Sequence, residues 1–127
     1  MARGEKVRNG ERWTEARFWS FIRSLLRSGF RKWGVKVDAQ QRARRLKKGY
    51  KRRYEYRCNK CKGWFPNSQV EVDHITPAGS LKCYDDLAGF VHRLFPEIDG
   101  LQVLCKPCHK VKTAEERAAA VAKRKKK

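Results

Sequence analysis

Long apolar runs are absent from this 127-residue chain, and acidic residues are few. No stretch approaches the roughly 18 to 20 apolar residues that a membrane-spanning helix needs, so we expect no membrane partner. The N-terminus mixes Arg3, Glu5 and Arg8 with no apolar stretch behind them, so we expect no secretory signal. The length suits one domain with a modest core, and we expect a cytoplasmic protein.

Acidic residues are much rarer than basic residues in both flanks of the chain, but not in its centre. Residues 1–57 hold 19 Lys and Arg against 5 Asp and Glu, residues 58–108 hold 5 against 6, and residues 109–127 hold 8 against 2. A near-neutral centre between two basic flanks, with a net charge of +19, predicts a polyanionic partner. Nucleic acid is favoured over an anionic membrane surface. The alternative is charge that only keeps the chain soluble, but solubility seldom needs such an excess of one sign.

Five cysteines are present, and four of them form two C-x-x-C pairs, termed here the first knuckle (Cys58 and Cys61) and the second knuckle (Cys105 and Cys108). Because no secretory signal is expected, a metal site is favoured over disulfides. The two-residue gap lets both thiolates turn toward one ion, so two knuckles predict a tetrahedral structural Zn²⁺ site. Cys83 lies outside the pattern, and we expect a free, partly buried thiol there.

Helical spacing of apolar residues marks residues 14–29. Thr14 is placed to cap this helix and Gly29 to end it. We expect the apolar positions to pack in the core; they are Phe18, Trp19, Phe21, Ile22, Leu25 and Leu26. The alternatives are a base-stacking platform and a membrane-surface helix. Residues 1–12 are polar, and we expect them to be frayed.

A basic run follows this helix. Asp38 is placed to cap a second helix over residues 39–49, and eight of the twelve residues from Arg42 to Arg53 are Arg or Lys. Such a cluster can neutralise nucleic-acid phosphates without reading sequence; the alternative is a solvated helix face. The residues that we expect to bind nucleic acid are Arg44, Arg45, Lys47, Lys48, Lys51, Arg52 and Arg53.

The rest of the chain alternates between strand and helix patterns. Residues 69–75 and 101–105 predict short strands, and residues 85–95 predict an amphipathic helix. We expect the inward residues of that helix to be Leu87, Phe90, Val91 and Leu94, and His92 to be partly buried. An Ala-rich C-terminal stretch predicts a final helix. The last five residues are all basic, and we expect them to be disordered without a partner.

Three motifs in this order, CNKC, VDHITP and LCKPCHKVKT, resemble the zinc-knuckle branch of the HNH endonucleases. The resemblance covers residues 58–113. It implies an α+β fold: a small ββα-metal core stapled by the four-cysteine zinc site, with a mainly helical basic N-terminal extension. It also implies a division into an extension (1–50), a zinc-stabilised nuclease core (51–116) and a basic helix end and tail (117–127).

Carried onto the matching positions, the family's chemistry makes His74 the general base that activates water. Asp73 and His109 become ligands of a catalytic divalent ion, Mg²⁺, Mn²⁺ or another. The implied reaction is hydrolysis of DNA phosphodiester bonds, for which a neutral imidazole is a suitable base near neutral pH. Neighbouring residues of a strand point to opposite faces, so Asp73 and His74 reach one site only if the strand twists or ends there.

One position departs from the family pattern. The middle Asn of the family motif precedes the second strand and helps to hold the loop that bears the base, and this chain has Gly100 there. Asp99 and Gln102 are the candidates to replace it.

The resemblance also implies a phage or mobile-element product, acting in the cytoplasm of a bacterial host, with DNA held through its phosphate backbone. Phage packaging or processing proteins are candidate partners. Two alternatives stay open. One is a non-catalytic, zinc-stabilised module that binds DNA or RNA, and the other is a scaffold for a larger complex.

Overall fold

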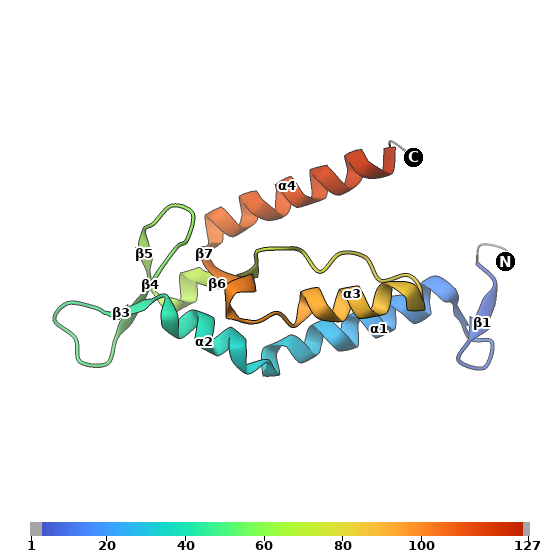
Figure 1. The fold of residues 1–127 in the computed structure, drawn as a ribbon, viewed down its shortest axis with the longest axis horizontal. Coiled ribbons are helices and arrows are strands. Elements are labelled where there is room, and N and C mark those ends of the chain that lie inside the picture. The colour runs from blue at the N-terminus through green and yellow to red at the C-terminus, as the bar shows by residue number, and fades with distance from the viewer. Residues whose placement is uncertain (1–3, 126–127) are drawn as a thin grey trace. The chain divides into compact units, whose positions relative to one another are not determined.

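The computed structural model describes residues 4–125, and these form an α+β protein with four α-helices and three small sheets (Figure 1). The predicted class is therefore confirmed. The chain divides into two compact units: unit 1 is Met1–Gly34 with Ala78–Pro96, and unit 2 is Val35–Pro77 with Glu97–Lys127. The functional boundaries at residues 50 and 116 stay predictions. Within the described residues, no helix combines the length and the apolar character that crossing a membrane requires.

Unit 1 begins with a hairpin. Strand β1 (Lys6–Arg8) pairs antiparallel with β2 (Trp13–Thr14). The Arg8 guanidinium donates two hydrogen bonds of 2.9 Å to the Glu15 carboxylate and lies 4.2 Å from the centre of the Phe18 ring. These contacts tie the hairpin to the helix that follows, so the prediction of a frayed segment is wrong for residues 6–12.

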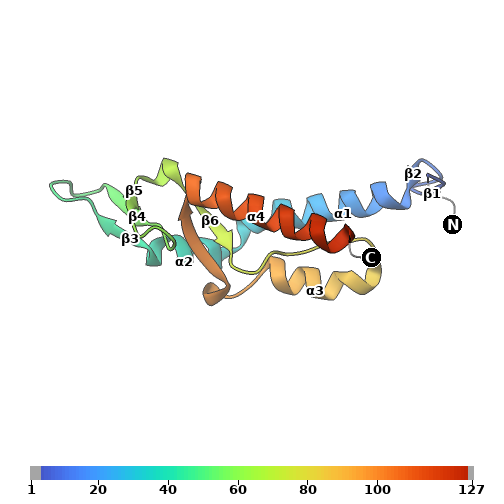
Figure 2. The same cartoon turned by 90° about the horizontal axis from the view of Figure 1, so that it is seen from above.

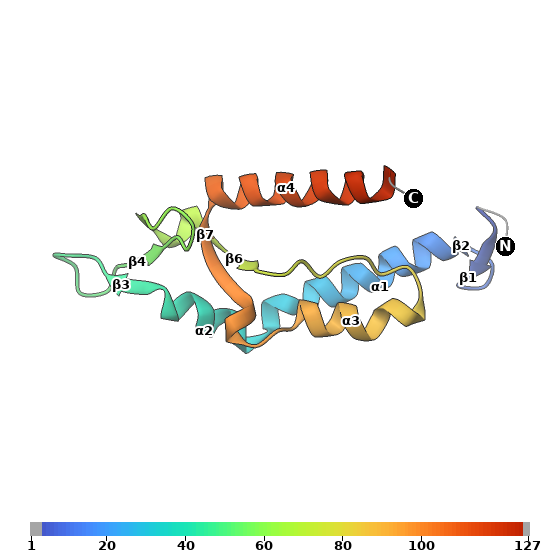
Figure 3. The ribbon, with the colours of Figure 1, turned by 45° about the horizontal axis from the view of Figure 1, so that its top comes forward.

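Helix α1 (Glu15–Gly29) begins where the sequence predicts. The side chain of Thr14 caps it by accepting a hydrogen bond of 3.1 Å from the backbone N–H of Arg17. The helix also ends at Gly29 as predicted. Gly29 keeps a right-handed φ of −67°, and the chain continues into the 3₁₀ turn η1 (Phe30–Lys32). Helix α3 (Tyr84–Leu94) lies alongside α1 in the same unit (Figure 3).

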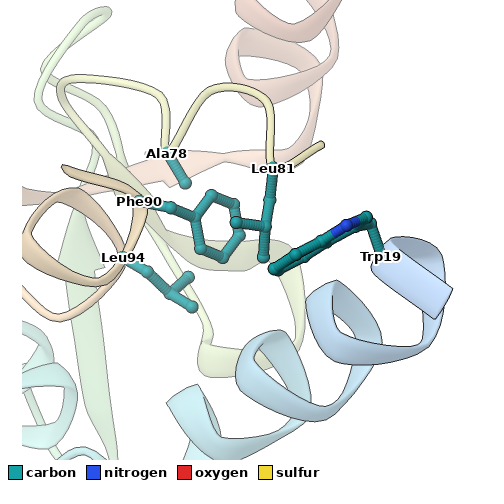
Figure 4. Close-up of a cluster of buried hydrophobic side chains, with 5 residues drawn as sticks. All are labelled: Trp19, Ala78, Leu81, Phe90 and Leu94. Carbon is teal, nitrogen blue, oxygen red and sulfur yellow. The ribbon is translucent and has the colours of Figure 1, made fainter. Parts of the chain in front are cut away.

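The core of unit 1 is formed by α1, α3 and the loop that precedes α3 (Figure 4). Its buried side chains are Trp19, Ala78, Leu81, Phe90 and Leu94, and Phe18, Ile22, Leu26 and Leu87 pack against them. The positions from α1 and α3 confirm most of the core residues that the sequence predicts for these two helices. The prediction is wrong for Phe21, Leu25 and Val91, which are exposed, because each helix buries a narrower face than its apolar residues span. It is also wrong for Cys83 and His92, which are exposed rather than partly buried.

Unit 2 contains α2 (Gly34–Arg42), apart from its first residue, and then a three-stranded sheet. In this sheet β3 (Arg44–Leu46) pairs with β4 (Tyr54–Arg57), and β4 pairs with β5 (Trp64–Phe65). Residues 44–57, termed here the basic hairpin, project from the rest of the unit (Figure 1). The helix predicted over residues 39–49 is therefore wrong beyond Arg42, and Asp38 lies inside α2 instead of capping a helix.

Cross-strand contacts explain why the basic run forms strands. The Arg44 guanidinium lies 4.0 Å from the centre of the Tyr54 ring, and Arg45 lies 3.8 Å from that of Trp64. Gly49 has a φ of +88°, a conformation that glycine adopts without steric cost, and it lets the chain reverse between β3 and β4. Pairing with distant aromatic residues thus outweighs the local helix preference of Arg, Lys and Leu.

The second sheet of unit 2 confirms the two predicted strands. Strand β6 (Val70–His74) pairs antiparallel with β7 (Leu101–Cys105). The 3₁₀ turns η2 (Asn67–Gln69) and η3 (Ile98–Gly100) precede the two strands, and α4 (Lys106–Lys125) follows β7 directly (Figure 2). The predicted disordered tail is wrong for residues 123–125, which continue α4. Residues 126 and 127 lie outside the described residues.

Candidate functional site

The two knuckles come together in unit 2. The Sγ atoms of Cys58, Cys61, Cys105 and Cys108 all lie within 4.8 Å of one another, and those of Cys61 and Cys105 are 3.9 Å apart. Sulfurs about 2.3 Å from a tetrahedral zinc ion lie about 3.8 Å from one another. The four cysteines are therefore close enough to hold a metal ion, and an all-sulfur donor set suits zinc.

The local backbone favours a thiolate in this cluster. Burial raises the pKa of the Cys58 thiol, but backbone N–H groups of Cys105 and Cys61 outweigh burial and lower the pKa to about 6. Hydrogen bonding to Cys105 instead raises the pKa of the Cys108 thiol to about 12. One thiolate is thus ready near neutral pH, and a bound metal would displace the other protons.

Asp73 is a buried carboxylate in the middle of the second sheet. It is 7% exposed, and among residues 4–124 it is the one buried polar or charged side chain. Its Oδ2 accepts a hydrogen bond of 2.9 Å from Gln102 Nε2 and lies 3.1 Å from Lys112 Nζ. Its Oδ1 lies 3.5 Å from His109 Nε2. A buried carboxylate is unfavourable unless it is paired, and here Gln102 and Lys112 supply the partners.

His109 projects from the first turn of α4 onto β6. Its Nδ1 lies 2.8 Å from Glu71 Oε2, and its Nε2 faces Asp73. A carboxylate this close to Nδ1 favours the tautomer with the proton on Nδ1, and in a neutral imidazole this leaves the lone pair of Nε2 directed at Asp73. Two electron-pair donors then face each other over 3.5 Å, which is longer than a normal hydrogen bond.

Lys112 completes the cluster from the next turn of α4. Its Nζ contacts Asp73, lies 3.1 Å from Glu116 Oε1, and donates a hydrogen bond of 3.0 Å to the backbone oxygen of His74. Burial lowers the pKa of this ammonium, but the contacts with Glu116 and Asp73 outweigh burial and raise it. The cation partly neutralises Asp73.

His74 ends β6 and is half-buried. Regular pairing continues through His74, opposite Leu101, so the strand does not end before it. Alternation along β6 therefore directs the side chains of Glu71 and Asp73 toward α4, and that of His74 toward the other face. The structure thus brings Asp73 and His109 together. His74 is linked to this pair through Lys112, whose Nζ donates a hydrogen bond to the backbone oxygen of His74.

A backbone contact supports the end of β6 from Gly100, the position at which the HNH motif that the sequence resembles has an asparagine. The oxygen of Gly100 accepts a hydrogen bond of 3.0 Å from the N–H of Ile75, the residue after His74. Of the two candidate replacements, Asp99 pairs with Arg42 at 3.3 Å. Gln102 instead contacts Asp73 and accepts a hydrogen bond of 2.8 Å from Asn59 in the first knuckle.

All seven residues of the predicted nucleic-acid cluster are exposed, and they lie on β3, on the turn of the basic hairpin and just before β4. Tyr50 is 48% exposed at the same turn, with Lys47 and Arg53 within 5.3 Å of its ring centre. The hairpin therefore presents cations and an aromatic ring to solvent.

Sequence reasoning missed Glu71 and Lys112. Glu71 shares a strand face with Asp73 through the two-residue period, and Lys112 shares a helix face with His109 through three-residue spacing. These periodicities were available signals, but they identify a contact only once β6 and α4 are known to pack together.

None of the family models, curated proteins and solved structures compared with the chain matches it.

Proposed function

We propose that the chain is a metal-dependent endonuclease of the HNH type that hydrolyses phosphodiester bonds in DNA. The observation that carries the proposal is the buried Asp73 of β6 facing His109 of α4 over 3.5 Å, in the same unit as the cysteine cluster. Strands β6 and β7 followed by α4 have the order of a ββα-metal core. The four cysteines would hold the structural zinc, with Cys108 and His109 adjacent in the chain.

The geometry of Asp73 and His109 fits a divalent ion. Two ligands each about 2.1 Å from a shared ion lie about 3.0 Å apart in octahedral geometry and about 3.4 Å apart in tetrahedral geometry. The observed 3.5 Å between Oδ1 and Nε2 is close to this range. Asp73 and His109 would hold a Mg²⁺, Mn²⁺ or similar ion. When bound, the ion would polarise the scissile phosphate and neutralise the leaving oxygen.

The chain's own residues supply the other functions. His74, as a neutral imidazole, would take the proton from the attacking water. Lys112 holds the carboxylate of Asp73 and the backbone oxygen of His74, so it fixes these neighbours relative to each other. The basic hairpin would grip the DNA phosphates without reading sequence.

A non-catalytic nucleic-acid-binding module is the second candidate. It is favoured by the ion pair between Lys112 and Asp73, which stabilises the buried carboxylate without a metal, and by the alternation that turns His74 away from Asp73. The zinc site and the basic hairpin serve both candidates equally well.

Plasmid cleavage distinguishes the two. Zinc-loaded protein is incubated with supercoiled plasmid and Mg²⁺ or Mn²⁺, and nicked and linear products are measured on gels. We expect cleavage by the parent protein and at least a 100-fold lower rate for His74→Ala, because general-base catalysis contributes about 10²–10⁴-fold. Cys83→Ser, at an exposed thiol outside the site, should cleave like the parent.

Binding measured on the same proteins makes the result decisive. His74→Ala should bind DNA as tightly as the parent. If the parent binds DNA but does not cleave it in the presence of any divalent ion tested, the endonuclease proposal is wrong and the binding module stands.

A further inference from the structure

Unit 2 contains a pocket beside β7 that the proposed chemistry does not use. Its volume is about 280 Å³, and its walls come from the end of α2, the end of β4, the first knuckle and β7. Ligand pockets in proteins usually exceed about 300 Å³, so this one suits a ligand the size of one nucleotide unit or smaller. Leu101 and Val103 give it an apolar wall.

Three cations line the pocket: Arg42, Arg57 and Lys62. The one acid that lines it, Asp99, pairs with Arg42 at 3.3 Å. Within residues 4–125, no carboxylate forms an ion pair with Arg57 or Lys62. The pocket therefore has an excess of positive charge. A guanidinium and an ammonium that line the same pocket and pair with no acid are suited to a phosphate group.

Backbone hydrogen bonds hold the walls of the pocket in place. The N–H of Arg57 donates to the oxygen of Ala43 over 2.9 Å, and the N–H of Asn59 donates to the oxygen of Val103 over 2.8 Å. The side chain of Asn59 also accepts a hydrogen bond of 3.1 Å from Lys62 Nζ. A pocket whose walls are already tied together loses little entropy when a ligand binds.

The pocket is linked to Asp73 by the side chain of Gln102. Asn59 Nδ2 donates to Gln102 Oε1 over 2.8 Å, and Gln102 Nε2 donates to Asp73 Oδ2 over 2.9 Å. Asn59 and Gln102 both line the pocket. A ligand there would therefore lie near the buried carboxylate.

We propose that this pocket binds one nucleotide unit of a nucleic-acid strand. Arg57, Lys62 and Arg42 hold its phosphate, and its sugar or base lies against Leu101 and Val103. The anion site follows from the charges that line the pocket, whereas the choice of a nucleotide as the ligand rests on the proposed function.

Mononucleotide binding tests the proposal. Zinc-loaded protein, with no Mg²⁺ or Mn²⁺ added, is titrated with thymidine 5′-monophosphate, inorganic phosphate and thymidine, and amide shifts are followed by NMR. We expect the monophosphate to bind more tightly than either fragment and to shift residues 57–62 and 101–103. Arg57→Gln and Lys62→Gln should each weaken its binding about tenfold. Lys60→Gln removes an exposed cation of the same knuckle that does not line the pocket, and it should have no effect.

A variant that keeps every charge separates the pocket from general electrostatic attraction. Ala43→Leu fills part of the pocket, so it should weaken binding of the monophosphate without changing the net charge. Unchanged binding in Ala43→Leu, or an equal loss in Lys60→Gln, would overturn the proposal. Folding of each variant is checked by its zinc content and amide spectrum.

The source of the nucleotide is tested with a 5′-phosphorylated thymidine dinucleotide. We expect it to shift the same residues, because a strand must continue out of the pocket. If the dinucleotide is excluded while the monophosphate binds, the pocket takes free nucleotides and the proposal is wrong. Because no catalytic ion is present, a failed plasmid assay leaves this result unaffected.

Discussion

Glu71 contacts the imidazole of His109 on the side opposite Asp73. The 2.8 Å contact to Nδ1 orients the ring and directs Nε2 at the carboxylate. If His109 holds the proposed divalent ion, a partner such as Glu71 contributes about 10–100-fold to metal affinity. Neither Glu71 nor His109 is deeply buried, so both can be replaced without leaving a cavity.

Glu71→Ala should therefore weaken Mn²⁺ binding to zinc-loaded protein by about 10–100-fold, measured by the electron paramagnetic resonance signal of free Mn²⁺. Glu71→Gln keeps an acceptor for Nδ1–H and should weaken binding less. The matched control is Glu115→Ala, which removes an exposed carboxylate of α4. Equal Mn²⁺ affinity in Glu71→Ala and the parent would show that Glu71 does not orient His109 for a metal.

Glu15 is a residue of unit 1 with a strongly lowered pKa. Hydrogen bonds from Arg8 and from the indole of Trp19 lower the pKa of its carboxyl to about 2, from a usual value of 4.5. A pKa lowered by folding means that the carboxylate stabilises the folded state above about pH 4.5. This contribution is lost as the pH falls through about 2.

The Trp19 indole N–H, which donates to Glu15 over 2.9 Å, can report on this titration. Its NMR resonance should shift with a midpoint near pH 2, and the shift should disappear in Glu15→Gln. Glu11→Gln, at an exposed position of the same hairpin, should leave the titration as it is. A midpoint near pH 4.5 would mean that the hydrogen bonds do not persist in solution.

At the scale of elements, the basic hairpin replaces the helix that the sequence predicts. Strands β3 and β4 place their cations on a projecting ribbon, and its turn carries Lys47, Lys48, Lys51 and Arg52. A two-stranded ribbon can enter a groove of DNA or follow its backbone. The residues predicted to bind nucleic acid are therefore still exposed together, although the helix predicted over residues 39–49 is wrong beyond Arg42. What changes is the spacing between their side chains, which is that of strands and a turn.

Lys51→Gln with Arg52→Gln should weaken DNA binding and flatten its salt dependence. Each lost phosphate contact reduces the slope of log K against log salt by about 0.9, so the pair should reduce it by about 1.8. Fluorescence anisotropy at several salt concentrations measures this slope. The control replaces Arg12 and Lys32, two exposed cations of unit 1. An equal reduction in both pairs would mean that only net charge matters.

At the scale of the whole molecule, the two units differ in what stabilises the fold of each. Unit 1 has an apolar core built on Trp19, Phe90 and Leu94. The second cluster, in unit 2, consists of Cys58, Leu104 and Cys105 with Phe65 and Cys108 packed against them, so three of its members are proposed zinc ligands. Metal should therefore decide the stability of unit 2 much more than that of unit 1.

Chelation of zinc should unfold unit 2, because structural zinc contributes about 10–16 kcal/mol in small zinc-stabilised folds. We expect the NMR signals of Trp64 in unit 2 to collapse while those of Trp19 in unit 1 persist. Cys58→Ser should have the same effect, and Cys83→Ser should have none. Metal analysis should find about one zinc per chain. A folded unit 2 without zinc would contradict the four-cysteine site.

The sequence alone determined the features that depend on short spacings. The two C-x-x-C pairs predicted the cysteine cluster. Strand and helix patterns predicted β6, β7, α1 and α3, because these patterns reflect the local geometry of strands and helices. The Ala-rich composition predicted α4. The capping role of Thr14 was predictable because its hydroxyl oxygen can accept a hydrogen bond from a backbone N–H in the first turn of the helix.

Only the tertiary structure decided which residues meet. The basic run contacts aromatic residues eight to nineteen positions away. Glu71 and Lys112 reach His109 and Asp73 only because α4 packs on β6. The pocket takes Arg42, Arg57 and Lys62 from three separate segments. The exposure of Leu25 and Cys83 likewise depends on what covers each element. Local preferences are worth tenths of a kcal/mol per residue, and long-range packing outweighs them.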